Sequence, residues 1–215
     1  YRLVAINQRG ILGSGGSLEG ITLRDLARDV VTIADKLGIN KFHTAGWAFG
    51  NRTSRMLATI YPERLASLIL IAAGGLVPAL TQPGELATLL DNQALSEEEK
   101  IHYARRTMFS SATDRNIVRE YVQGLTYWPE ARKGQRVANQ NTPLADWVAG
   151  GNGPVLMIMG EDDLTAPIEN GYRMKAEYGD RLTLISVEKA GHAVGLEKPE
   201  EVAAAMIEFL QKHAI

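Results

Sequence analysis

The sequence contains no cysteine. A disulfide scaffold, a cysteine zinc site and a thiolate nucleophile are therefore excluded together, while the cellular compartment stays open, with the cytoplasm as our expectation. An excess of charge of one sign is also lacking, because 23 Lys and Arg face 25 Asp and Glu, for a formal net charge of −2. A balanced charge gives no electrostatic footprint for a polyanion, so we expect no nucleic-acid partner.

Long apolar runs are missing as well. The longest, residues 68–80, is interrupted by two glycines and Pro78, and it is shorter than the ~20 residues that a membrane span needs. Metal-ligand spacings such as His-Glu-x-x-His do not occur, and the glycines at 13–16 do not complete a dinucleotide-binding pattern. We therefore expect a small-molecule substrate with no membrane contact, no metal and no cofactor.

Apolar runs rich in Val, Ile and Leu are present at regular intervals. They are continuous rather than alternating, which is typical of strands buried on both faces of a parallel sheet. Helical patterns lie between them, so the predicted fold class is α/β, with a mostly parallel sheet flanked by helices. The predicted strands are residues 3–6, 42–45, 68–72, 155–159 and 182–187.

The clearest helical pattern covers residues 22–37. Thr22 and Asp25 have the spacing of a capping box at its start, and Gly38 supplies the stop. Further helices are predicted at residues 49–61, 97–108, 114–125 and from Pro199 onward.

Strand and helix stop alternating between about residues 79 and 151. This stretch holds helical segments and no convincing strand, which predicts an inserted helical layer. The glycines before Pro154 then mark the return to the sheet. We predict a core made of residues 1–78 and 153–215, with a helical cap at residues 79–152.

The informative segment joins the strand at 42–45 to the following helix. It reads Gly46-Trp47-Ala48-Phe49-Gly50, and the glycines flank a residue in a sharp turn where strand and helix approach closely. This turn resembles the nucleophile elbow of the α/β-hydrolase fold family, Gly-x-Ser-x-Gly, with Ala48 at the position of the nucleophilic serine.

Three other segments resemble motifs of the same family in the same chain order. Residues 7–14 resemble a loop rich in Arg and Gly that follows a core strand. Residues 160–167 match Gly-x-x-Asp-x-x-x-Pro, which puts Asp163 at the acid position, with neighbouring Asp162 as its rival. His192 follows the last predicted strand, where the family has its catalytic histidine. The remaining histidines, His43, His102 and His213, match no motif.

The resemblance implies a division of roles. Asp163 fixes the tautomer of His192, which takes and returns a proton. The backbone N–H of Phe49 stabilises an oxyanion at a helix N-terminus, and Trp47 and Phe49 line the floor of the substrate site. The family's second oxyanion donor belongs to a strand that would precede Tyr1, so the chain resembles a hydrolase lacking its N-terminal strands.

A methyl group at position 48 cannot attack a substrate, and three explanations of Ala48 stay open. In the first, which we favour, a hydrolase relative acts on a small organic ester, amide or related substrate through its Asp–His pair without a serine nucleophile. In the second, the chain is a Ser-to-Ala variant of an ordinary serine esterase. In the third, it binds a small molecule or a partner without catalysis.

Overall fold

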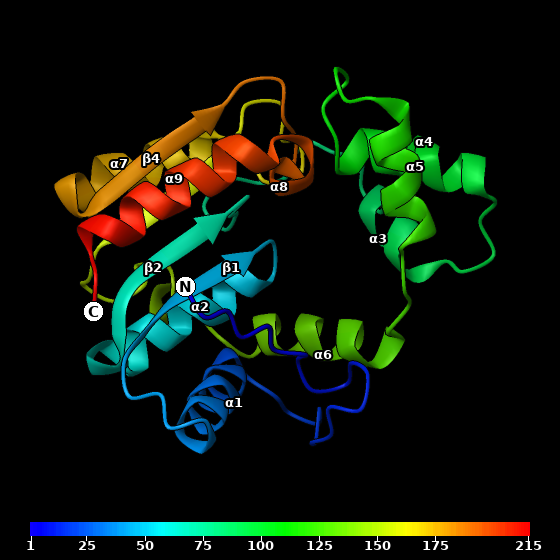
Figure 1. The fold of residues 1–215 in the computed structure, drawn as a ribbon. Helices are drawn as coiled ribbons and strands as arrows, with labels where there is room; N and C mark the ends of the chain where they lie inside the picture. The colour runs from blue at the N-terminus through cyan, green and yellow to red at the C-terminus, as the bar shows by residue number, and fades with distance from the viewer.

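The computed structural model describes residues Tyr1–Ile215, and its centre is one parallel sheet. The strand order is β1-β2-β3-β4, and every neighbouring pair is parallel. In Figure 1 the labelled strands β1, β2 and β4 point toward the side where most of the inserted helices lie. The parallel α/β prediction is thus confirmed. The strands are β1 (Phe42–Trp47), β2 (Leu65–Ile71), β3 (Val155–Gly160) and β4 (Leu182–Val187).

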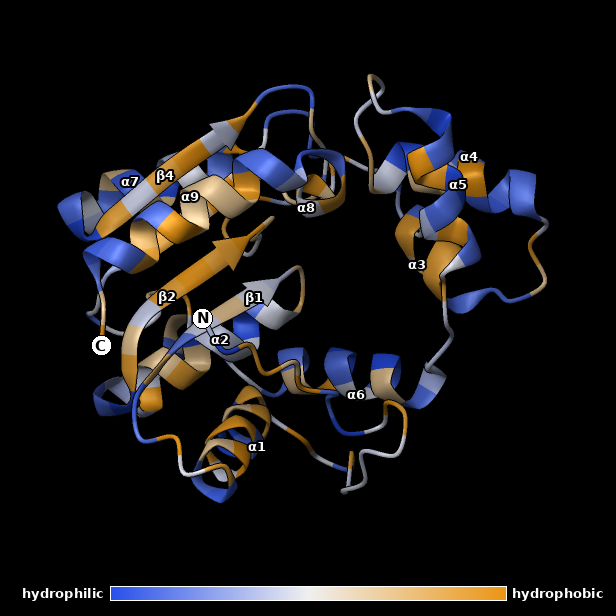
Figure 2. Cartoon of the chain, in the orientation of Figure 1, coloured by the Kyte–Doolittle hydropathy of each residue, from blue (hydrophilic) through white to orange (hydrophobic).

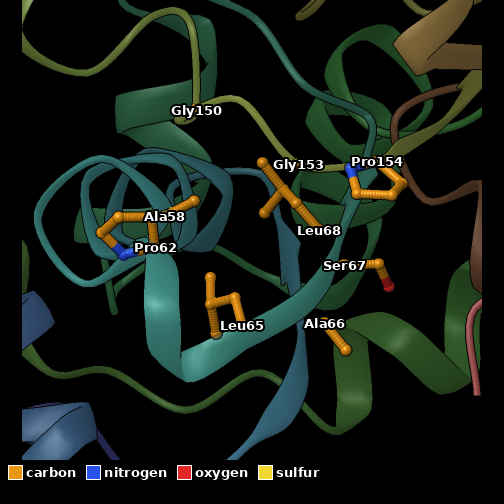
Figure 3. A pocket seen from close by; sticks show the side chains of 9 residues that line it. All are labelled: Ala58, Pro62, Leu65, Ala66, Ser67, Leu68, Gly150, Gly153 and Pro154. Carbon is orange, nitrogen blue, oxygen red and sulfur yellow. The ribbon is translucent and has the colours of Figure 1, made fainter. Parts of the chain in front are cut away.

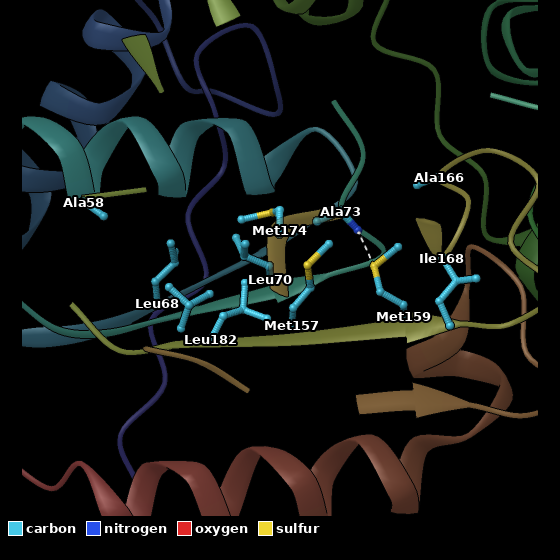
Figure 4. Packing of buried hydrophobic residues seen from close by; sticks show 11 residues of the cluster. Ala58, Leu68, Leu70, Ala73, Met157, Met159, Ala166, Ile168, Met174 and Leu182 are labelled. Atoms are coloured by element: carbon cyan, nitrogen blue, oxygen red, sulfur yellow. Dashed lines mark hydrogen bonds between the residues drawn. The ribbon is translucent and has the colours of Figure 1, made fainter. Parts of the chain in front are cut away.

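Both faces of the sheet are covered, which explains the continuous apolar runs. Along β3, Met157 and Met159 join a cluster with Met174 of α7 (Glu169–Tyr178), which is drawn in Figure 4. Their neighbours, such as Ile158, face the opposite way and pack with Phe209 of α9 (Pro199–Lys212). Because successive side chains of a strand point to opposite faces, a strand between two helical layers must be apolar at every position.

Helix α1 (Leu23–Lys36) begins where the sequence predicts. Thr22 is its N-cap and forms the expected capping box with Asp25, while Gly38 beyond its end has a positive φ of 68°. The apolar side of α1 packs on α2 (Gly50–Ile60), where Leu57 and its neighbours are fully buried. These contacts fix the helix that follows the elbow.

The predicted helical insertion lies between β2 and β3, and it holds four α-helices, two more than the sequence predicted there. Helices α3, α4 and α5 share their own apolar cluster, and Figure 2 shows their hydrophobic sides turned toward one another. Helix α6 is different, because its Ala138 is buried in the cluster of α1 and α2. The inserted helices are α3 (Glu85–Asp91), α4 (Glu97–Thr107), α5 (Arg115–Gln123) and α6 (Pro129–Gln140), followed by the short 3-10 helix η2 (Leu144–Asp146).

The prediction of a strand at residues 3–6 is wrong. The chain forms no strand before β1, and Leu3 is 89% exposed. A strand needs a hydrogen-bonded neighbour, and β1 pairs only with β2, so an apolar composition alone does not place this segment in the sheet. The following loop is held by Arg9, whose Nε donates to Asp29 of α1 at 2.7 Å.

The remaining elements are short. They are the 3-10 helices η1 (Pro62–Arg64) and η3 (Gly179–Arg181), and helix α8 (Val194–Glu197) directly after His192. None of the helices combines the length and the apolar character that crossing a bilayer requires.

Candidate active site

The turn between β1 and α2 has the backbone geometry of an elbow. Ala48 has a φ of 50°, in the left-handed region that L-residues rarely occupy. A Cβ on Gly46 would overlap the backbone carbonyl of Gly50, so glycine is required at 46. At Gly50 itself a Cβ would meet nothing within 4 Å. The predicted close approach is therefore correct for the first glycine and wrong for the second.

The elbow leaves two amides, those of Phe49 and Gly50, without a partner in the chain. The N–H groups of Asn51 and Arg52 donate to the carbonyls of Ala48 and Phe49, at 3.2 and 3.0 Å. The N–H of Phe49 donates no hydrogen bond within the chain and lies at the N-cap of α2. A free amide at a helix N-terminus favours negative charge. The side chain of Phe49, in contrast, packs against the cluster of α1 and α2.

Asp163 and His192 form a buried pair at the carboxyl ends of β3 and β4. The Nδ1 of His192 lies 2.8 Å from Oδ2 of Asp163, and the exposed fractions of the two side chains are 6% and 0%. The other oxygen of Asp163 accepts from the N–H groups of Thr165 and Ala166, at 2.8 and 2.7 Å. The carboxylate is therefore fully hydrogen-bonded, and it holds the imidazole so that Nε2 is left without a partner in the chain.

The rival carboxylate is separate from this pair. Asp162 is exposed, and its carboxylate accepts from the hydroxyl of Ser110 in the inserted region. Gly160 lets the acid loop approach the histidine loop, because a Cβ there would overlap the carbonyl of Ala190. Gly191 lets the histidine loop approach the insertion, because a Cβ there would lie 2.7 Å from the backbone of Phe109. Asp163 is thus the carboxylate that reaches His192.

Trp47 connects the elbow to the histidine loop. Its indole Nε1 donates to the backbone carbonyl of His192 at 2.8 Å, and the two rings are 6.0 Å apart. Because Trp47 directly precedes Ala48, this bond draws the elbow and His192 to the same edge of the sheet. The indole is 42% exposed, so part of it faces the surface beside the imidazole.

A small depression opens beside the imidazole, and the inserted region supplies most of its wall. Ala48 is not among the residues that line it. The lining residues are Arg106, Thr107, Met108, Phe109, Asp162, Leu164 and His192.

A second pocket lies around the start of β2, between residues such as Leu65 and Pro154 (Figure 3). Ligand sites of open parallel sheets lie beyond the carboxyl ends of the strands, and this pocket lies at the opposite end. No group of three or more His, Asp or Glu side chains lies close enough to hold a metal ion.

The other histidines lie outside this group. His43 Nδ1 lies 2.7 Å from the Ser67 hydroxyl on the neighbouring strand, and burial lowers the pKa of His43 below its ordinary value. His102 packs edge-on against the next residue of α4, and His213 contacts Phe209 near the C-terminus. None of the three contacts Asp163.

Sequence reasoning missed one participant, Glu197 of α8. Its carboxylate accepts from the N–H of Gly191, next to the histidine, at 2.7 Å and from the N–H of Ser110 at 2.8 Å. The sequence gives only a weak signal for this residue. A Glu five residues after a His matches no motif, and only the turn of the chain at α8 brings its carboxylate back to the histidine loop.

The structure is that of a parallel α/β protein with a sharp strand-to-helix turn and a buried Asp–His pair at the carboxyl edge of the sheet. The chain belongs to the alpha/beta hydrolase fold family, which its residues 1–199 match.

Relatives within this family carry different activities. A 2-hydroxy-6-oxo-6-phenylhexa-2,4-dienoate hydrolase of Comamonas testosteroni is 31% identical over 197 residues, covering 86% of this chain and 68% of the enzyme. A 3-oxoadipate enol-lactonase of Acinetobacter baylyi is 27% identical over 209 residues, covering 94% of this chain and 75% of the lactonase. The dihydrolipoyllysine-residue acetyltransferase component of an acetoin cleaving system of Pseudomonas putida is 28% identical over 221 residues, and the chain spans 57% of its length.

Among solved structures, a thermophilic esterase of Thermogutta terrifontis superposes with a TM-score of 0.74 at 22% identity. The match covers 97% of this chain and 79% of the esterase. This likeness bears on the fold alone.

Proposed function

We propose that the protein hydrolyses a small, largely apolar ester or related carbonyl compound, with His192 as general base and water as nucleophile. The observation that carries the proposal is the buried bond between His192 Nδ1 and Asp163 at 2.8 Å. A carboxylate bound to Nδ1 leaves Nε2 to accept a proton and stabilises the imidazolium that results.

Ala48 has a definite place in this scheme. Its methyl group offers no oxygen for a covalent intermediate, so the attacking water takes over the role that serine has elsewhere in the family. The water loses a proton to Nε2 of His192 as its oxygen bonds to the carbonyl carbon. The resulting oxyanion accepts a hydrogen bond from the N–H of Phe49. Collapse then breaks the carbon–oxygen bond of the ester, and His192 returns the proton to the departing alcohol.

Exposed apolar side chains support the choice of substrate class. Trp47, Leu164 and Leu196 are each more than two fifths exposed, and they flank the elbow, the acid loop and the histidine loop respectively. The depression beside the imidazole is itself lined by Arg106, Thr107 and Asp162 as well as by apolar residues, so the apolar choice rests on these three exposed side chains. The names of the Comamonas hydrolase and the Acinetobacter lactonase likewise indicate small carbonyl substrates.

The test compares His192→Ala and Asp163→Asn with the parent on a panel of activated esters. General-base catalysis is worth about 10²–10⁴-fold, so we expect His192→Ala to lower kcat by that amount. His102→Ala is the matched control, because His102 is exposed and touches neither catalytic loop. Circular dichroism and thermal unfolding check that each variant is folded.

Ala48→Ser separates the competing explanations. We expect it to add a covalent route and raise kcat, and the gain should vanish when His192→Ala is combined with it. If His192→Ala changes neither turnover nor ligand affinity in the parent, His192 takes no part in catalysis. Saturable binding of the esters without turnover would support a binding protein instead, and activity in Ala48→Ser alone would favour a lost serine.

A further inference from the structure

One carboxylate in the structure receives hydrogen bonds from two parts of the chain that lie far apart in sequence. Oε2 of Glu197 accepts from the N–H of Gly191, next to the catalytic histidine. Oε1 accepts from the N–H of Ser110 and from the hydroxyl of Thr113, both in the inserted region. Glu197 therefore joins the histidine loop to the insertion with both of its oxygens.

Residues 107–113, here called the cap turn, connect α4 to α5 and make further bonds to the same loops. The carbonyl of Met108 accepts from the N–H of Ala193 at 2.7 Å. The hydroxyl of Thr165 donates to the carbonyl of Thr107 at 2.5 Å, and Ser110 donates to Asp162. The cap turn is thus bonded to the acid loop on one side and to the histidine loop on the other.

The cap turn also forms the wall of the depression beside the imidazole, through Thr107, Met108 and Phe109. Any shift of this segment changes the space next to His192. Such a shift also pulls on Gly191, where an added Cβ would lie 2.7 Å from the backbone of Phe109. The position of the imidazole and the shape of the wall therefore depend on the same contacts.

We propose that Glu197 is a positioning residue: it fixes the cap turn against the histidine loop and thereby sets the orientation of the His192 ring. This inference rests on the proposed function for its kinetic consequence only. The carboxylate form is required, because donors approach both oxygens. A glutamine has one acceptor oxygen, so its NH₂ group faces an N–H and leaves one donor unpaired.

The test uses Glu197→Gln, which conserves size, with Glu200→Gln as matched control. Glu200 is exposed in the first turn of α9 and bonds to no loop of the site. The first readout needs no activity. We expect Glu197→Gln to speed hydrogen exchange by at least about tenfold at whichever amide faces the new NH₂ group, that of Ser110 or that of Gly191, as the loss of about 1.4 kcal/mol of protection implies, and to shift the NMR signals of the His192 ring. Glu200→Gln should do neither.

The second readout is kinetic. We expect Glu197→Gln to lower kcat about tenfold on any ester that the parent hydrolyses, with a smaller change in KM. Thr113→Val removes one donor from the insertion side only. When Thr113→Val is combined with Glu197→Gln, the further loss of kcat caused by Thr113→Val should be smaller than in the parent, because Glu197→Gln has already weakened the same bond.

Two results overturn the proposal. The first is that Glu197→Gln has the same amide exchange rates and the same His192 ring signals as Glu200→Gln, which would show that Glu197 does not fix the cap turn. Faster exchange with an unchanged ring signal, or with an unchanged kcat in an active parent, would show that the cap turn does not position His192. If the parent hydrolyses nothing, the proposed function fails, while the exchange and NMR comparison still decides the role of Glu197.

Discussion

Arg55 of α2 is a buried charge without a partner, and replacing it should stabilise the protein. The residue is fully buried, and none of its three guanidinium nitrogens donates a hydrogen bond. The guanidinium carbon lies 5.5 Å from the ring centre of Trp147, and the same ring has Arg52 at 5.5 Å. No carboxylate forms an ion pair with either arginine.

The free-energy cost of this burial follows from its effect on ionisation. Burial, with a smaller contribution from the like charge of Arg52, lowers the pKa of Arg55 from 12.5 to about 9. At about 1.4 kcal/mol per pKa unit, the charged form costs about 5 kcal/mol at neutral pH. The contact with Trp147 offsets about 0.5–2 kcal/mol of this. We therefore expect Arg55→Met to raise the free energy of unfolding by about 3–4 kcal/mol at neutral pH.

The assay is urea unfolding at pH 7, read as a rise in the midpoint at an unchanged m-value. Arg52→Met is the matched control on the same helix. Arg52 donates to Asn139, so its removal leaves that amide oxygen without a partner and should give no stabilisation. A loss of stability in Arg55→Met would refute the reasoning, because it would mean that a bound anion or water pairs with the guanidinium.

The difference between Arg55→Met and the parent should also depend on pH. A base whose pKa is lowered by folding carries its full cost below the folded-state pKa, here about 9. This free-energy cost falls as the pH rises from the folded-state pKa toward the pKa of arginine in the unfolded chain. In that range Arg55 has lost its proton in the folded protein, and only the unfolded chain still binds it. We expect the gap to narrow by about 1 kcal/mol between pH 9 and pH 10, because Arg55 is already half deprotonated in the folded protein at pH 9.

Two further predictions concern the elbow and use the same unfolding assay. Gly46→Ala should lower the free energy of unfolding by about 1–3 kcal/mol or more, because the new Cβ would overlap the carbonyl of Gly50. Gly50→Ala is the control: its Cβ enters open space, so the free energy of unfolding should stay the same or rise. Equal losses of stability at both positions would contradict the geometry. Ala48→Gly should leave stability unchanged or raise it, because it relieves a φ of 50°, whereas Ala58→Gly in the middle of α2 should cost about 1 kcal/mol; a comparable loss at Ala48 would argue against left-handed strain there.

Local signals predicted most of the elements correctly. The capping box at Thr22 depends on residues three positions apart, and the strands contain short apolar runs, which in β3 extend over the whole strand. The requirement for Gly46 also follows from the motif, because strand and helix can turn so sharply only without a Cβ. These features depend on spacings of a few residues, which a linear sequence displays directly.

Contacts between distant residues were decided only by the tertiary structure. Residues 3–6 have the composition of a strand but no neighbouring strand to pair with. The motif Gly-x-x-Asp-x-x-x-Pro favoured Asp163 over its rival Asp162, and the folded acid loop turns Asp163 toward His192 and Asp162 toward Ser110.

The amino-acid sequence by itself thus determined the α/β layering, the elbow and the candidate histidine. The tertiary structure decided which carboxylate holds that histidine and which one, Glu197, joins its loop to the insertion. The physical reason is that apolar periodicity and helix capping act within a few residues. A hydrogen bond between side chains depends on where the whole chain brings them in space.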